Sequence, residues 1–151
     1  MSRLVAALWR LVPAVWAGVL LCIALIATPA PFALLAVADA GRVAGRILGQ
    51  EAYLSLALGL VLVLLERRIA RDAPRQFSSG LVLALGTLFC TVAGYFALQP
   101  MMAAARAGQG ALSFGQLHAI SAVFYGIKVL LVLALAWRSA GATATGSAPS
   151  S

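Results

Sequence analysis

The sequence predicts an all-α membrane protein with four transmembrane helices in an antiparallel bundle. Of its 151 residues, 63% are hydrophobic and only 10% are charged, and the mean hydropathy is +1.01. A soluble domain carries about 25% charged residues, and a soluble fold of this composition would expose more apolar surface than water-soluble proteins tolerate. The second observation is a series of four apolar runs that can each form a helix of the ~20 residues that cross a bilayer, the second of them, Ala52–Leu65, only if its helix starts near Ile47 or Leu48.

The apolar runs set the positions of the four spans. The first run, Leu11–Ala38, contains no charge, and we expect Pro29 and Pro31 to end its helix. Gln99 and Pro100 are expected to end the third helix. We therefore expect spans at residues 11–30, 48–66, 78–98 and 117–137.

Three segments lie outside these spans. Residues 1–10 form a basic N-terminus, and residues 139–151, rich in Ser, Ala, Gly and Thr, are expected to form a flexible tail. Residues 32–50 have apolar side chains at helical spacing, which suits a short amphipathic helix on the membrane surface. The same pattern also fits a plain continuation into the second span, and both alternatives stay open. The apolar positions are Val37, Ala40, Val43, Ala44, Ile47 and Leu48.

The basic residues predict the orientation, because cytoplasmic segments of membrane proteins carry the excess of Lys and Arg. Seven flank the side that holds both termini: Arg3, Arg10, Arg67, Arg68, Arg71, Arg75 and Arg138. The other side has three: Arg42, Arg46 and Arg106. We expect both termini in the cytoplasm. The first apolar run is about twice as long as the core of a signal peptide, so we expect it to remain as a span.

Composition and motifs exclude several function classes. The net charge of +7 comes without a basic stripe of interleaved aromatics, so we expect no nucleic-acid binding. Cys22 and Cys90 form no CxxC motif and have no metal-ligand spacing, and His118 is the only histidine. No nucleophile elbow, phosphate loop or paired carboxylates occur. We therefore expect no metal, no cofactor and no enzymatic activity.

Each predicted span has one face of small or polar residues, as is typical of helix contacts inside membrane bundles. On the fourth span these residues form a stripe that either packs structurally or lines a polar path. The faces are Gly18, Cys22 and Pro29 on the first span; Ser55, Gly59 and Leu62 on the second; Thr87, Cys90 or Thr91, and Gly94 on the third; and His118, Ser121, Tyr125 and Lys128 on the fourth.

Lys128 is the most informative of these residues, because a Lys at the centre of a membrane helix costs about 2.5–3.5 kcal/mol on insertion scales. Glu51 and Glu66 lie at the two ends of the expected second span, so we expect no counter-ion for Lys128 within the chain. A structural role would have it snorkel or hydrogen-bond Thr87, Thr91 or a backbone carbonyl. A functional role would make it an anion or proton site.

Several short motifs, in this order, resemble the bacterial branch of the transmembrane protein 205-like family, small four-span proteins with no assigned function. This resemblance implies an integral protein of a bacterial inner membrane, and it brings no catalytic residues. The motifs are Trp16-Ala17-Gly18, Pro29 with Phe32, Ala40-Gly41-Arg42, Gly45-Arg46-Ile47, Glu66-Arg67-Arg68, the run Phe89–Phe96, and Phe114 followed by Leu117-His118 and Ser121.

Two functions follow as hypotheses. The first is a non-enzymatic scaffold, with an assembly or stress-related role, that contacts the lipid bilayer and a second copy or another membrane protein. The alternative is a small transporter or permeability factor with a polar path along the face from His118 to Lys128. A water-filled cavity at Lys128 would favour transport, and a filled core would favour the scaffold.

Overall fold

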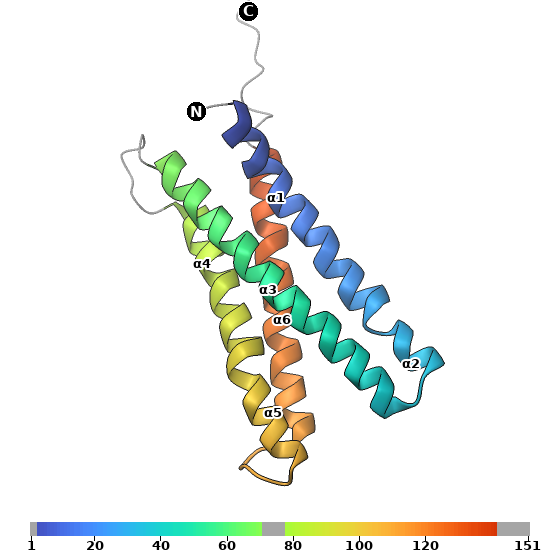
Figure 1. The fold of residues 1–151 in the computed structure, drawn as a ribbon. Coiled ribbons are helices and arrows are strands. Elements are labelled where there is room, and N and C mark those ends of the chain that lie inside the picture. The colour runs from blue at the N-terminus through green and yellow to red at the C-terminus, as the bar shows by residue number, and fades with distance from the viewer. Residues whose placement is uncertain (1–2, 71–77, 142–151) are drawn as a thin grey trace, which may run out of the picture.

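The computed structural model describes residues 3–70 and 78–141, and these ranges are almost entirely helical. They form four helical segments that are long and apolar enough to cross a membrane: Arg3–Leu34, Val37–Ala70, Ser79–Arg106 and Phe114–Gly141. The expected all-α fold with four membrane helices is therefore confirmed (Figure 1).

The four segments form an antiparallel ring. Helix α1 (Arg3–Cys22) and helix α4 (Ser79–Thr91) each pack against both α3 (Val37–Ala70) and α6 (Phe114–Gly141). Helices α3 and α6 consequently lie diagonally across the bundle. We call the end where α1 begins and α6 ends the termini end, and the opposite end the cavity end. Toward the cavity end, α1 and α3 diverge from α4 and α6 (Figure 1).

The first segment is longer and less regular than the expected span 11–30. Residues 3–10, expected to precede the membrane helix, are the start of α1. A turn of π-helix, η1 (Ile23–Ala27), follows α1, and a short helix, α2 (Ala30–Leu34), ends the segment. Pro29 and Pro31 lie at the break between η1 and α2. Both stand at the start of α2, where proline is tolerated because the N–H that it lacks would have no acceptor within the helix.

Residues 32–50 do not form a separate surface helix. From Val37 onward they are the first part of α3, which runs without interruption to Ala70. Within this part Ala40 and Ala44 are buried, whereas Val37 is exposed. The continuation into the second span is therefore correct. At about 1.5 Å per residue, this places Glu51 near the middle of a long helix rather than at its end.

The expected stop at Gln99-Pro100 is also wrong. The third segment continues from α4 through a π-helical stretch, η2 (Val92–Ala97), into α5 (Leu98–Arg106). Pro100 lies in the first turn of α5, where proline is tolerated. At the other end of the bundle, α6 includes Ser139–Gly141, which were expected to belong to the tail; residues 142–151 lie outside the described residues.

The termini half of the bundle is filled by apolar side chains. Trp16 and Leu20 of α1, Leu62 of α3, Ala84 of α4 and Val132 of α6 form its buried cluster. Small residues allow close helix contacts, as predicted for the second and third spans, where Ser55, Gly59, Leu62, Thr87, Cys90, Thr91 and Gly94 are all buried. The predicted face of the first span is wrong, because Gly18 and Cys22 are exposed while Trp16, Ala17 and Leu20 are buried.

Candidate functional site

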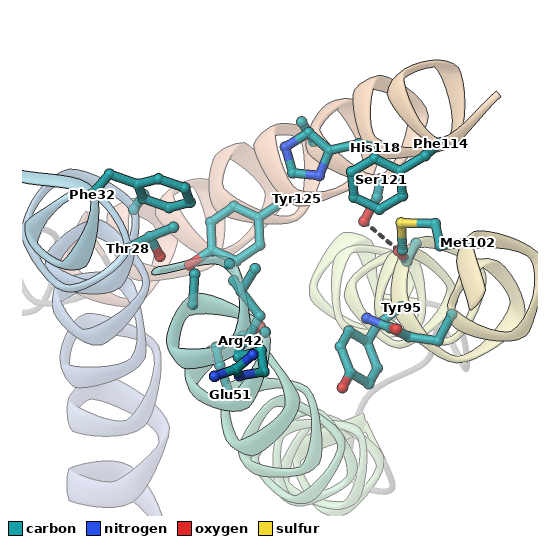
Figure 2. Close-up of a pocket in the computed structure, with 18 of the residues that line it drawn as sticks. Thr28, Phe32, Arg42, Glu51, Tyr95, Met102, Phe114, His118, Ser121 and Tyr125 are labelled. Atoms are coloured by element: carbon teal, nitrogen blue, oxygen red, sulfur yellow. Dashed lines mark hydrogen bonds between the residues drawn. The ribbon is translucent and has the colours of Figure 1, made fainter. Parts of the chain in front are cut away.

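A cavity of about 780 Å³ occupies the cavity end of the bundle, where the helices diverge. Its lining comes from all four segments (Figure 2). Thr28 and Phe32 lie on one side, and Tyr95 and Met102 lie on the opposite side. The short helix α2 packs on α3 rather than on α6. The first segment therefore contacts the last one mainly through α1, on the side of the cavity nearer the termini end. This volume is within the usual range for small-molecule sites, about 300–1,000 Å³.

A buried ion pair lines the deep part of this cavity. The Lys128 ammonium donates to both carboxylate oxygens of Glu51, with Nζ 2.7 Å from Oε1 and 2.9 Å from Oε2. Only 4% of the Lys128 side chain and 3% of the Glu51 side chain are exposed. The pair joins α6 to α3 across the diagonal of the ring. The expectation that Lys128 has no counter-ion is therefore wrong, because α3 begins eleven residues before the expected span and carries Glu51 to the level of Lys128.

Ser55 and Trp16 extend the pair toward α1. The Ser55 hydroxyl donates to Glu51 Oε1 and accepts a hydrogen bond of 3.1 Å from Trp16 Nε1. Lys128 Nζ also lies 3.5 Å from Ser55 Oγ. Ser55 is fully buried. Side chains from α1, α3 and α6 thus satisfy one another's polar atoms at the point where the filled half of the bundle meets the cavity.

Tyr125 connects the same level of the bundle to the backbone of α1. Its hydroxyl donates to the carbonyl oxygen of Leu20 at 2.9 Å, and Lys128 Nζ lies 4.7 Å from the centre of its ring. One turn closer to the cavity end, Ser121 Oγ donates to the carbonyl oxygen of Gly94 at 2.6 Å. Gly94 allows η2 and α6 to approach this closely because it has no side chain: a Cβ at this position would lie 2.4 Å from the Cβ of Phe124.

Basic side chains surround the outer part of the cavity. Arg42 lines it and forms an exposed ion pair with Asp39. The Arg106 guanidinium lies 4.4 Å above the centre of the Phe114 ring, and that ring stacks on His118 with centroids 5.9 Å apart. Among the described residues that line the cavity, three are basic, namely Arg42, Arg106 and Lys128, and one, Glu51, is acidic.

Residues 11–111 match the family described as a domain of unknown function, DUF4149. The chain belongs to this family. No curated protein and no solved structure shows a significant match to the chain. The DUF4149 match includes Glu51, Ser55 and Trp16 but ends before α6. Lys128 and the whole α6 stripe therefore lie outside the matched range, although they complete the cavity of this DUF4149 protein.

The structure brings most of the predicted seam to the cavity. His118, Ser121, Tyr125, Lys128 and Thr91 all line it. Thr87 is buried but does not line it. The two threonine hydroxyls donate to carbonyl oxygens of their own helix, Thr87 to Ala84 at 2.7 Å and Thr91 to Thr87 at 2.8 Å. A hydrogen bond from Lys128 to one of these threonines, one of the alternatives that the sequence left open, is not formed, because Lys128 donates to Glu51 and Ser55 instead.

Glu66 forms a second buried polar cluster, at the termini end, which the sequence reasoning missed. Its carboxylate accepts hydrogen bonds from Trp9 Nε1 at 2.8 Å and from Ser78 Oγ at 2.6 Å. It lies against Gly80, where a Cβ would be 2.2 Å from Oε1. Within the described ranges no cation pairs with Glu66.

The basic residues predicted to set the topology lie just beyond Glu66. Arg67 and Arg68 are exposed at the end of α3. Arg71 and Arg75 lie outside the described residues.

Proposed function

We propose that this DUF4149 protein is a small transporter or permeability factor, and that the cavity is its solute site. The observation that carries the proposal is the combination of an open cavity and a filled core in one bundle. The cavity ends at the Glu51–Lys128 pair near the middle of the helices, and the apolar cluster closes the other half. A path that is open at one side and closed at the other is what one conformation of a transporter requires.

The energetics of the ion pair support this proposal. Two buried charges lose much of their hydration, and replacing such a pair by apolar residues is often neutral or stabilising. Ionisable residues inside membrane segments are uncommon outside pathways and binding sites. A bundle with a packing role alone would gain nothing evident from Glu51 and Lys128, whereas a solute site gains two charged groups at the end of an otherwise mainly apolar cavity.

A test of access to the cavity can use its native thiol. Cys90 lines the cavity, and Cys22 is exposed on α1. In a Cys22→Ala background, a small charged methanethiosulfonate should modify Cys90 in membranes. The variant Gly45→Phe should slow this reaction, because Gly45 lines the cavity with open space around its missing Cβ. Gly18→Phe is the matched control, since Gly18 also has open space but does not line the cavity.

The scaffold hypothesis makes the opposite prediction for the same experiment. It is favoured by the filled termini half of the bundle, and a dry cavity would leave Cys90 unmodified in every variant. Complementation of a deletion strain extends the comparison to the cell: Gly45→Phe should lose function and Gly18→Phe should keep it if the cavity is the working part.

We further propose that the protein lies in a bacterial inner membrane with both termini in the cytoplasm, so that the cavity faces outward. The seven-to-three distribution of basic residues supports this orientation, and the resemblance to bacterial transmembrane protein 205-like proteins supports the inner membrane as its location. A reporter that is active only outside the cytoplasm should give signal when inserted at Gly108, between α5 and α6, and none when fused after the last residue. The reverse pattern would overturn the orientation.

A further inference from the structure

We propose that the cavity binds a small organic monoanion with an apolar body, and that Glu51 takes up one proton for each anion bound. This inference rests on the proposed solute site and adds the chemical class of its ligand and the link to protons. It follows from the charge of the lining, from the partners of Lys128, and from the hydroxyl that joins Glu51 to Trp16.

The lining favours an anion that carries apolar groups. The lining has more basic than acidic side chains, with Arg42, Arg106 and Lys128 against Glu51. The electrostatic potential in the cavity should therefore be positive, even though Asp39 partly neutralises Arg42. Most of the remaining surface is hydrophobic, including Ala24, Phe32, Val37, Leu48 and Met102. A hydrophilic anion such as inorganic phosphate would leave this surface without partners, whereas a carboxylate or phosphate ester with a hydrocarbon body would cover it.

An anion that reaches the deep end must compete for Lys128. The ammonium has three protons; two are given to Glu51, and the third points to no closer acceptor than Ser55 Oγ at 3.5 Å. A bound oxyanion can take this third proton or displace one Glu51 oxygen. In either case two negative groups then share one ammonium in a poorly solvated site, and like charges at such distances repel strongly.

Uptake of a proton by Glu51 removes this repulsion. The carboxylate takes up one proton from the bulk solution and becomes a neutral carboxylic acid, while the anion takes over the charge pairing with Lys128. The site therefore gains one anion and one proton, and its net charge does not change.

Ser55 allows both protonation states of Glu51. Its hydroxyl donates to Glu51 Oε1 and accepts from Trp16 Nε1. A hydroxyl can accept two hydrogen bonds and its proton rotates, so Ser55 can instead accept the O–H of a protonated Glu51. Trp16 keeps its acceptor in both states.

The other titratable groups around Glu51 are less suited to accept this proton. Cys90 of α4, Tyr95 of η2 and Tyr125 of α6 are neutral at neutral pH, and Arg42 and Arg106 stay charged. The Tyr125 hydroxyl already donates a hydrogen bond to the carbonyl oxygen of Leu20. His118 lies on the exposed outer part of the cavity and could also gain a proton near an anion, so the experiment must separate it from Glu51.

The test measures protons taken up per anion bound. Purified full-length protein in phosphatidylcholine nanodiscs is titrated with octanoate near pH 7 by calorimetry, in buffers of different ionisation enthalpy, with empty nanodiscs subtracted. Wild type should take up about one proton per octanoate, and its affinity should fall about tenfold per pH unit as the pH rises. Glu51→Gln should bind octanoate without proton uptake and with an affinity that no longer depends on pH. His118→Asn also changes a residue of the cavity lining, so its affinity can differ from wild type, but it should still take up about one proton per octanoate.

Two further arms identify the ligand. Octanol, the uncharged analogue, should bind at least tenfold more weakly than octanoate. Anionic phosphatidylglycerol in the nanodiscs should weaken octanoate binding if the natural anion is a lipid headgroup, and should have no effect if it is a free amphiphile; both results agree with the inference.

Four results would overturn the inference: no octanoate binding to wild type, equal binding of octanol, no proton uptake by wild type, or proton uptake that survives Glu51→Gln, as it would if His118 took the proton. If octanoate binds to wild type without any proton uptake, the proton link fails but the solute site stands. If Cys90 is also inaccessible to the thiol reagent, the proposed function itself fails.

Discussion

Replacing Lys128 by Met is expected to destabilise the bundle. The change leaves Glu51, whose side chain is 3% exposed, without the ammonium that donates to both of its carboxylate oxygens. Removing one partner of a buried pair costs about 3–5 kcal/mol in soluble proteins. Single polar contacts between membrane helices average about 0.6 kcal/mol, which gives about 1 kcal/mol for two hydrogen bonds as a lower bound. We expect a loss of about 3 kcal/mol, because the stranded charge adds to the lost bonds.

Thermal melting in a mild detergent measures this loss. For a chain of this length, 3 kcal/mol corresponds to a decrease in Tm of roughly 6–12 °C. The double variant Glu51→Gln with Lys128→Met should recover at least half of that decrease, since it removes both charges and keeps most of the volume. A Lys128→Met protein that melts at or above the wild-type temperature would refute the reasoning, because it would mean that the Glu51 carboxylate does not depend on Lys128 for its charge pairing.

Two further predictions concern packing and the termini end. Gly94→Ala should lower stability by about 1–3 kcal/mol, since its Cβ would lie 2.4 Å from that of Phe124, while Gly126→Ala, with open space at its Cβ, should be neutral or slightly stabilising; equal melting temperatures would contradict the close contact. Trp9→Phe should cost about 1–3 kcal/mol by removing a donor from the buried Glu66 carboxylate, and a change too small to detect by melting would mean that this bond is not formed in the membrane.

The sequence predicts the fold well because it depends on long, strongly apolar segments. Four such runs leave little choice but four membrane helices. The predicted helix boundaries are wrong where a local sequence signal indicates an end or a surface position but the helix continues through it. Gln99 and Pro100 look like a stop, yet a π-helical stretch just before them places Pro100 in a first helical turn. Arg42 and Arg46 suggest a surface segment, yet both lie within α3.

Part of the candidate site can also be predicted from the sequence. The stripe from His118 to Lys128 follows from helical spacing alone, and all four of its residues line the cavity. The partner of Lys128 could not be found in this way, since the pairing depends on which residues of α3 lie at the level of Lys128. The wrong start of the second span placed Glu51 at a membrane surface. Starting that helix at Val37 would have placed it near the centre.

The two buried glutamates provide a comparison within one helix. Glu51 and Glu66 lie fifteen residues apart on α3, or about 22 Å, and each is tied to α1 by a Trp indole, Glu51 through Ser55 and Glu66 directly. Among the described residues, the donors to Glu66 are neutral, and Glu66 lies against Gly80 without lining the cavity. Its position indicates a structural role, in which it fixes the contact between α1, α3 and the start of α4.

The same substitution at the two positions should therefore have different effects. Glu66→Gln keeps one oxygen for Trp9 but turns an amide group toward Ser78, so we expect a lower melting temperature with octanoate binding and its proton uptake unchanged. Glu51→Gln keeps one oxygen acceptor for Lys128 but leaves the buried ammonium without a counter-charge, so we expect a lower melting temperature together with loss of proton uptake. Calorimetry and melting of both variants give four values that separate the two roles. If Glu66→Gln instead abolished proton uptake, the proton would enter the filled half of the bundle, and the assignment of Glu51 as its acceptor would be wrong.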